Sequence, residues 1–218
     1  MSARRSPGRA ASWIGAVLCA LLLPLGTPVA AGEPGIVVFG DSLTAGFGLP
    51  REDAFPARLE AALRARGHHW RVIDAGVSGD TSAGGLARVD WVLAEVPAAV
   101  IVELGANDGL RGLPTDRLEA NLDAILVRIR ETDAAVLLAG MRAPGNFGAD
   151  YEAAFSAVYE RLAARHGVAF YPFFLEGVAL VPELNQADGI HPNAAGVAEI
   201  VRRMVPHVVA LIAPLKGG

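Results

Sequence analysis

A serine and a histidine that lie far apart in the sequence have the residue types and neighbours that acyl transfer requires. Ser42 follows a short apolar run and a Gly-Asp pair, and His191 lies three residues after Asp188. A serine hydroxyl becomes a nucleophile when an imidazole accepts its proton, and a carboxylate commonly orients that imidazole. Gly189, between the acid and the base, allows a bend that presents both groups from one turn. The sequence therefore predicts a catalytic triad of Ser42, His191 and Asp188.

Two further loops contain groups that can bind the oxyanion of a tetrahedral intermediate. Gly79 lies in segment 76–82 and Asn107 in segment 105–109, each after a predicted strand. We expect the backbone N–H groups of Ser42 and Gly79 and the side-chain amide of Asn107 to donate to this oxygen. Each residue alone has an ordinary explanation as a helix cap or a turn residue. Their joint occurrence at strand ends favours an active site.

Alternating short and long apolar patterns predict the fold. Five short runs, rich in β-branched residues and bounded by glycine or proline, predict buried strands at 35–39, 70–73, 98–104, 135–139 and 168–171. Between them, apolar stripes at 118–129 and 151–162 predict helices, and Asn193 is expected to cap the last helix. This alternation indicates a parallel sheet covered on both faces. We expect one α/β domain of three layers around a five-stranded parallel sheet.

Such a sheet would bring the candidate residues together. Ligands bind open parallel sheets in the crevice outside the carboxyl ends of the strands. The segments with Ser42, Gly79 and Asn107 follow the first three predicted strands, and His191 comes after the fifth. Ser42 stands at a strand-to-helix junction, where the helix N-terminus is expected to favour developing negative charge. The Gly-x-Ser-x-Gly elbow is absent around Ser42, which argues against the α/β-hydrolase family.

These motifs closely resemble the SGNH (GDSL-type) hydrolase family, with blocks at residues 40–43, 79, 105–107 and 188–191. Within the family, the chain is most similar to the bacterial thioesterase I, lysophospholipase L1 and arylesterase group, at segments 78–82, 102–105 and 107–112. The resemblance implies a flavodoxin-like strand order, 2-1-3-4-5, and the triad and oxyanion roles given above.

The resemblance also points to the loop after the fourth strand, which borders the acyl pocket in this group. It makes Ala143, Pro144 and Phe147 candidate substrate contacts. Close relatives tend to carry a bulkier residue than alanine before the proline, so the preferred acyl chain length stays open.

The N-terminus has the order of a secretory signal, with Arg4, Arg5 and Arg9 before an apolar run near 13–25 and small residues at 29–31. We expect residues 1–31 to be cleaved, leaving a hydrolase domain at 32–218 in the periplasm or outside the cell without a stable membrane anchor. An uncleaved anchor is the alternative, but the run is shorter than the roughly 20 residues of a spanning helix.

Charge and composition argue against several other classes of protein. The formal net charge is −4, and loss of the three N-terminal arginines would take it to −7, so a nucleic-acid partner is not expected. No Cys/His cluster has metal-ligand spacing, and the only cysteine, Cys19, leaves with the signal. We expect no metal, no cofactor and a monomer.

The sequence thus predicts a serine esterase or thioesterase that hydrolyses aryl and alkyl esters, lysophospholipids or acyl thioesters through an acyl-serine intermediate. A polysaccharide O-deacetylase is an alternative, because the resembled family includes such enzymes. A lipid-binding protein with a silent site is a second alternative, from a different class. An apolar groove beside the loop at 143–147 would favour acyl chains over sugars.

Overall fold

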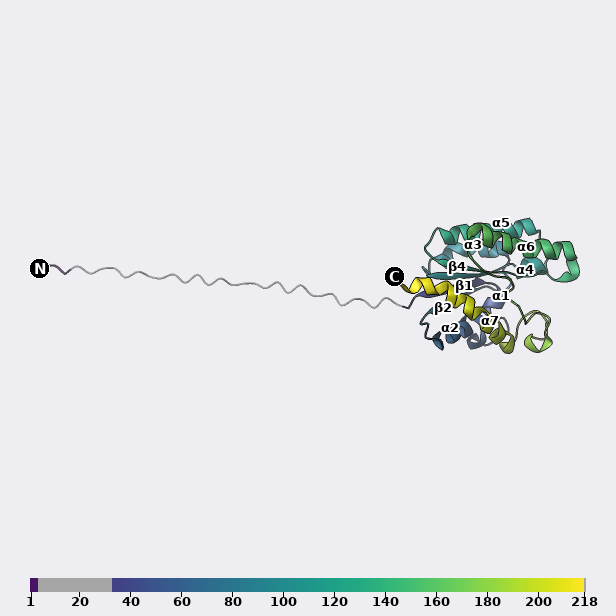
Figure 1. Ribbon diagram of the computed structural model, residues 1–218, viewed down its shortest axis with the longest axis horizontal. Helices are drawn as coiled ribbons and strands as arrows, with labels where there is room; N and C mark the ends of the chain where they lie inside the picture. Colours follow the sequence, from purple (N-terminus) through teal and green to yellow (C-terminus); the bar gives the residue numbers. More distant parts are fainter. Residues whose placement is uncertain (4–32, 218) are drawn as a thin grey trace. The chain divides into compact units, whose positions relative to one another are not determined.

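The computed structural model describes residues 1–3 and 33–217. The chain divides into two units, Met1–Gly32 and Glu33–Gly218. Residues 4–31 of the expected signal segment lie outside the described residues, so cleavage stays a prediction. The second unit contains all the strands and helices described below (Figure 1).

A five-stranded parallel sheet forms the centre of this unit. The strands are β1 (Gly35–Gly40), β2 (Arg71–Gly76), β3 (Ala99–Glu103), β4 (Ala135–Ala139) and β5 (Ala169–Tyr171), in the order β2-β1-β3-β4-β5. This is the order that the family resemblance implied. Gly40 pairs with Gly76 on one side and with Glu103 on the other. Three strands therefore end at the same level, which brings the loops that follow them to one rim.

The second strand differs from its prediction. It begins one residue after Trp70 and continues to Gly76 instead of ending at residue 73. It is also not buried throughout, because Arg71 and Asp74 are exposed. The reason is its position at the edge of the sheet, where only β1 pairs with it.

Seven helices of the described residues surround the sheet: α1 (Ser42–Ala45), α2 (Phe55–Arg64), α3 (Ser82–Leu93), α4 (Ala106–Leu110), α5 (Thr115–Arg130), α6 (Ala149–His166) and α7 (Ala194–Ile212). Figure 1 shows α3, α5 and α6 on one face and α2 and α7 on the other. The three predicted layers are confirmed. No helix in the described part of the chain is long and apolar enough to span a bilayer.

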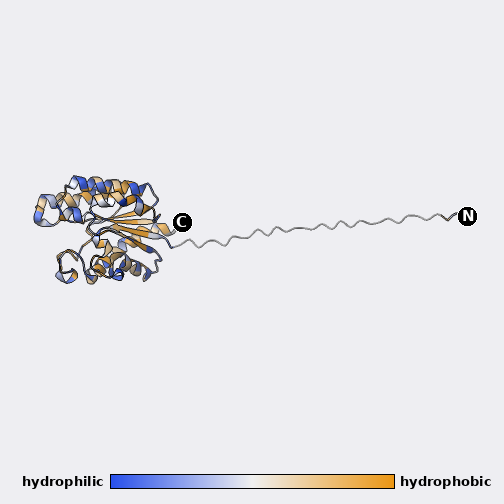
Figure 2. Ribbon diagram, turned by 180° about the vertical axis from the view of Figure 1, so that it is seen from behind, coloured by the Kyte–Doolittle hydropathy of each residue, from blue (hydrophilic) through white to orange (hydrophobic). Residues whose placement is uncertain are grey.

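The apolar stripes that the sequence predicted are turned toward the sheet. In α5 the predicted positions Leu118, Leu122, Ile125, Leu126 and Ile129 are all buried. Burying a side chain of this kind contributes about 1.5–3 kcal/mol, which explains why the periodic segments pack where they do. Figure 2 shows the same division, with apolar residues on the strands and polar residues along the outer sides of the helices.

The start of α7 is fixed by the predicted cap. Asn193 Oδ1 accepts hydrogen bonds from the backbone N–H groups of Ala195 and Gly196, at 3.0 and 3.1 Å. Its amide donates to the carbonyl oxygens of Glu183 and Asn185. Because His191 lies only two residues before this cap, the same bonds restrict the loop that carries it.

Candidate active site

The structure brings the three predicted triad residues into one hydrogen-bonded chain. Ser42 Oγ lies 3.0 Å from His191 Nε2, although 149 residues separate the two positions. On the other side of the imidazole, Nδ1 lies 2.7 Å from Asp188 Oδ2. These distances suit proton transfer from the hydroxyl to a ring that a carboxylate orients.

The Asp188 carboxylate is stabilised by its own turn. Oδ1 accepts the backbone N–H groups of Ile190 and His191 at 2.9 and 3.0 Å. Gly189, at φ 69°, lies in the left-handed region, where glycine carries no Cβ penalty. The hydrogen bonds from the backbone and side chain of His191 lower the pKa of Asp188 from 3.8 to about 2. The carboxylate is therefore ionised above that range, and its stabilising bonds weaken only as the pH falls from about 4 toward 2.

Two residues that sequence reasoning missed position the histidine loop. The Gln186 backbone N–H donates to the His191 carbonyl oxygen at 2.7 Å, and the Gln186 amide donates to the Phe47 carbonyl oxygen at 2.7 Å. The Phe47 ring lies against the His191 ring, with centroids 4.6 Å apart. The imidazole is thus restrained by stacking as well as by its two hydrogen bonds.

The nucleophile lies at the start of a single helical turn. Asp41 Oδ1 caps α1 by accepting the Leu43 N–H at 3.0 Å, and Gly46 ends the turn at φ 71°. The helix whose N-terminus was expected to favour developing negative charge does begin at Ser42, and it has four residues. The Ser42 N–H is the first of the helix and has no intrahelical acceptor, so it is available to an oxyanion.

A buried carboxyl group lies directly beneath this turn. Glu103 Oε2 lies 2.7 Å from Thr44 Oγ1 and 3.4 Å from the Asp41 N–H. Burial, and then the neighbouring Asp41 charge, raise the pKa of Glu103 well above its usual value. A Cβ at Gly40 would lie 2.1 Å from Thr44 Oγ1, which is why only glycine fits between the strand and the nucleophile.

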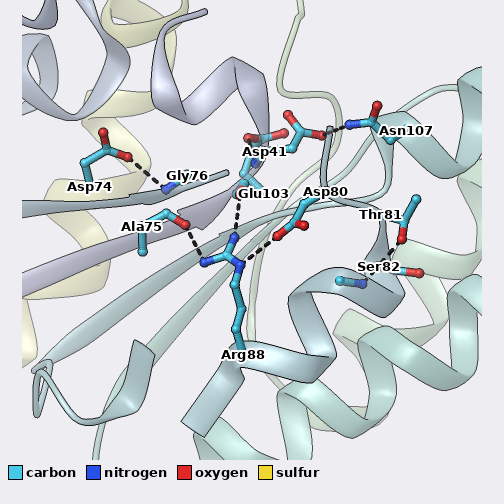
Figure 3. A network of polar contacts seen from close by, with 12 residues as sticks. Asp41, Asp74, Ala75, Gly76, Asp80, Thr81, Ser82, Arg88, Glu103 and Asn107 are labelled. Atoms are coloured by element: carbon cyan, nitrogen blue, oxygen red, sulfur yellow. Dashed lines mark hydrogen bonds and ion pairs between the residues drawn. The ribbon is translucent and has the colours of Figure 1, made fainter. Parts of the chain in front are cut away.

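The predicted oxyanion donor Asn107 is joined to the nucleophile turn. Its Nδ2 donates to Asp41 Oδ2 at 3.2 Å, as Figure 3 shows. Asp41 is fully buried, and this burial raises its pKa to about 6, although bonds from Leu43 and Asn107 oppose the shift. One amide hydrogen of Asn107 is used by Asp41, and the other remains for a ligand.

Close packing under α4 sets the position of Asn107. Gly105 adopts φ 114°, and a Cβ there would lie 2.1 Å from Tyr159 Oη. That hydroxyl donates to the Leu104 carbonyl oxygen at 2.9 Å inside the core. The strand therefore turns into α4 at a point where a larger residue would collide with a buried ring.

The third predicted donor, Gly79, lies in the loop between β2 and α3 at φ 85°. Its carbonyl oxygen accepts Arg111 Nη2 at 3.0 Å. In the part of the chain that the structure describes, the Gly79 N–H donates to no backbone or side-chain acceptor. The hydrogen bonds do not join Gly79 directly to Ser42 or Asn107, and its loop is positioned through neighbouring residues.

A buried pair of side chains, Ser82 and Asp108, helps to position the Gly79 loop, and the sequence did not reveal it. Ser82, the first residue of α3, donates its hydroxyl to Asp108 Oδ1 at 2.6 Å and its N–H to Asp108 Oδ2 at 2.7 Å. Asn121 completes the set by donating to Ser82 Oγ at 2.9 Å. Because Asp108 directly follows Asn107, this pair connects the two predicted oxyanion loops.

A groove of about 650 Å³ opens over the triad, and Ser42, Asn107 and His191 all line it. Most of its other lining residues are apolar, and they come from α1, α4 and the loops after β4 and β5: Leu43, Ala106, Leu110, Met141, Ala143, Pro144, Phe173, Leu175, Ala179, Leu180 and Ile190. A mostly apolar groove with a few convergent polar groups is typical of a site for small acyl compounds.

The loop after β4 contributes two of the three predicted substrate contacts. Ala143 and Pro144 line the groove, whereas Phe147 is not among its lining residues. Phe147 ends a short 3₁₀ helix, Gly145–Phe147, and its ring packs on Tyr151 with centroids 5.4 Å apart. The side chain of Phe147 is 43% exposed, and its contact with substrate stays a prediction.

The arrangement can carry out acyl transfer with its own side chains. It has a hydroxyl, an imidazole within hydrogen-bond reach of it, an ionised carboxylate behind the imidazole, and the amide of Asn107 in the lining of the same groove. Among the described residues, no group of three or more His, Cys, Asp or Glu side chains is arranged to hold a metal ion.

Comparisons with known proteins agree with this geometry. Residues 38–198 match the GDSL-like Lipase/Acylhydrolase family. The chain is 45% identical over 193 residues to Esterase TesA of Pseudomonas aeruginosa, covering 88% of this chain and 96% of that protein. It is 42% identical over 174 residues to Thioesterase 1/protease 1/lysophospholipase L1 of Escherichia coli K12, covering 79% and 82%.

The fold of the chain is also similar to that of a solved esterase structure. The psychrotrophic esterase EstA from Pseudoalteromonas, inhibited by monoethylphosphonate, superposes with a TM-score of 0.79 at 30% identity, covering 83% of this chain and all of that one. The family match spans most of the chain, and the relatives align over 82% or more of their length. The chain therefore belongs to the GDSL-like lipase/acylhydrolase family.

Proposed function

We propose that the chain is a serine esterase and thioesterase that hydrolyses small acyl esters through an acyl-serine intermediate. The observation that carries this proposal is the chain of hydrogen bonds from Ser42 through His191 to Asp188, at 3.0 and 2.7 Å, at the wall of a largely apolar groove. The names of the relatives, an esterase and a thioesterase/lysophospholipase, support the same class of reaction.

The reaction has two balanced steps. In the first, Ser42 Oγ attacks the acyl carbonyl carbon while His191 Nε2 takes the hydroxyl proton. The tetrahedral intermediate collapses, and the leaving alcohol or thiol takes that proton from His191, which leaves the acyl group on Ser42. In the second, His191 takes a proton from water, the hydroxide oxygen attacks the acyl carbon, and Ser42 regains its proton as the acid departs.

Asp188 acts on the imidazole and not on the substrate. Its carboxylate fixes the tautomer in which Nδ1 carries hydrogen and Nε2 faces Ser42, and it favours the imidazolium that forms in each step. The N–H groups of Ser42 and Gly79 and the amide of Asn107 are the proposed donors to the oxyanion.

Replacing Asn107 should separate transition-state stabilisation from substrate binding. We expect Asn107→Ala to lower kcat by about 10²–10³-fold with little change in KM, because the amide donates to charge that develops only in the transition state. Steady-state hydrolysis of a nitrophenyl ester measures both constants. Asn146→Ala, at an exposed position outside the groove, is the matched control. A rise in KM at unchanged kcat would show that Asn107 only binds the ground state.

The lining of the groove favours alkyl chains as the acyl group. Each methylene that enters an apolar groove adds about 0.8 kcal/mol, or about fourfold in kcat/KM. Purified protein should be assayed with nitrophenyl esters of graded length, lysophosphatidylcholine, palmitoyl-CoA and acetylated xylan. We expect kcat/KM to rise with chain length until the groove is filled, and to exceed the value for xylan. A preference for acetylated xylan would instead support a polysaccharide O-deacetylase, and no turnover of any compound a silent lipid-binding protein.

The sequence outside the described residues adds a proposal about location. We infer that residues 1–31 are a cleaved signal peptide and that the mature protein, 32–218, acts outside the cytoplasm as a monomer. The basic, apolar and small-residue order of this segment supports the inference. Exported lysophospholipids and short aryl or alkyl esters would then be more accessible substrates than acyl-CoA.

A further inference from the structure

The guanidinium of Arg88, in α3, contacts three segments that end at the rim of the sheet. Nη1 donates to the Ala75 carbonyl oxygen and Nη2 to the Gly40 carbonyl oxygen, both at 2.8 Å. Nε donates to Asp80 Oδ2 at 2.6 Å. Figure 3 shows this side chain extending from α3 to Ala75 and Asp80. None of them belongs to the triad, and Arg88 does not line the groove.

One of these contacts fixes the peptide that leads into the nucleophile. The Gly40 carbonyl oxygen accepts both Arg88 Nη2 and the Val77 N–H, at 2.8 and 3.1 Å. The other side of the same peptide, the Asp41 N–H, points to Glu103 Oε2. Rotation of this peptide would rotate the next one, whose N–H belongs to Ser42. Arg88 therefore restrains the direction of the first proposed oxyanion donor.

The contact with Asp80 restrains the second donor. Asp80 directly follows Gly79, and its N–H closes a turn onto the Val77 carbonyl oxygen at 3.1 Å. The side chains of Arg88 and Asp80 are only 17% and 18% exposed, so the ion pair is shielded from water more than a surface pair is. A Cβ at Gly84 would lie 2.5 Å from Asp80 Oδ1, so the glycine leaves room for Asp80 to lie against α3.

We propose that Arg88 is a positioning residue that sets the backbone N–H groups of Ser42 and Gly79 relative to each other, and so forms the oxyanion site. This inference rests on the proposed ester hydrolysis at Ser42. The two donors come from different loops, and the hydrogen bonds do not connect them directly. The guanidinium of Arg88 bonds to both loops, in addition to the bond from the Val77 N–H to the Gly40 carbonyl oxygen.

The shape of the guanidinium makes arginine the required residue. Its nitrogens form a rigid fork that here meets three acceptors in three directions. A lysine ammonium is a single point and cannot reach all three from one position. The plane also lies over the Phe39 ring, 4.6 Å from its centroid, which fixes its orientation. If Arg88 had a purely structural role, a positive charge on a packed aliphatic side chain would be sufficient.

The test compares Arg88→Lys and Arg88→Met with the wild type. A displacement of about 1 Å at a catalytic group costs about 10²-fold in rate, so we expect a loss of that order in kcat for Arg88→Met, a smaller loss for Arg88→Lys, and a nearly constant KM. Arg128→Met is the control, since among the described residues the exposed side chain of Arg128 bonds only to Asp90 and Glu131. In Arg88→Ala, added guanidinium at millimolar concentration should restore part of kcat without raising the unfolding temperature.

Amide resonances provide a measurement that does not depend on turnover. In ¹⁵N spectra, we expect the Ser42 and Gly79 amides to shift in Arg88→Met and to stay in place in Arg128→Met. Unchanged resonances at both positions, or a kcat for Arg88→Met equal to that of the wild type, would overturn the inference. If the wild type does not hydrolyse esters, the proposed function fails, while the resonances still decide whether Arg88 positions the two loops.

Discussion

Replacing Ser42 with alanine should lower kcat by about 10⁶-fold and leave a folded protein, because the variant lacks the atom that forms the acyl intermediate. Ser42 Oγ has one hydrogen-bond partner among the described side chains, His191 Nε2, so its loss removes little from the fold. The turn itself is held by Asp41 and Glu103, which the substitution does not touch. Hydrolysis of a nitrophenyl ester measures the loss, and the unfolding temperature checks the fold.

Ser156→Ala is the matched control for this substitution. Ser156 lies in α6, at a half-buried position outside the groove. Its replacement should leave kcat and KM at the values of the wild type. A Ser42→Ala protein that keeps the wild-type rate would mean that another group attacks the substrate.

Replacing Asp188 with asparagine should lower kcat by about 10⁴-fold, because the imidazole would then present the wrong tautomer to Ser42. The asparagine amide can donate to Nδ1, which would place the ring hydrogen on Nε2, toward the hydroxyl. Asp188 has a pKa of about 2, so the carboxylate of the wild type is ionised throughout any ordinary assay. The deficit should therefore persist from neutral to alkaline pH, as a pH series of kcat/KM would show.

Asp116→Asn provides the comparison for the loss of charge alone. Asp116 is exposed in the first turn of α5, and within residues 33–217 its carboxylate accepts only the N–H of the next residue, Arg117. This variant should remain fully active. If the Asp188→Asn enzyme kept nearly the wild-type kcat, another group would have to orient His191.

Most of the fold could be predicted because it follows from local patterns. The stripe from Leu118 to Ile129 has one apolar face, and such a face can only be buried against the sheet. Ser42 and Asn107 were identifiable because they lie two and four residues after the end of a strand, and parallel strands end at the same rim. Asp188 and His191 are only three residues apart, so their contact depends on one local turn.

The residues that the sequence did not reveal depend on contacts across the fold. The side chains of Arg88 and Asp80 interact between a helix and a loop, and no spacing rule indicates that the same guanidinium also reaches Gly40. From the sequence, Glu103 is a polar residue at the end of a predicted buried strand. Only the structure shows that the hydroxyl of Thr44 lies beside its carboxyl group. These partners are set by tertiary packing.

The loops also contain geometry that the sequence did not reveal. Phe147 lies in the loop predicted to border the acyl pocket, and its ring packs on Tyr151 at the end of a short 3₁₀ helix. The helix that begins at Ser42 ends at Gly46 after one turn. Apolar patterns do not encode such local loop geometry.

The most direct test of the account is the site of covalent modification by an alkyl fluorophosphonate, which forms a stable analogue of the tetrahedral intermediate on an activated serine. Peptide mass spectrometry of the treated protein should find one adduct, on the peptide that contains Ser42, and none in Ser42→Ala. An adduct on Ser78 or Ser82 instead, or no adduct in an enzyme that hydrolyses esters, would contradict the assignment of the nucleophile.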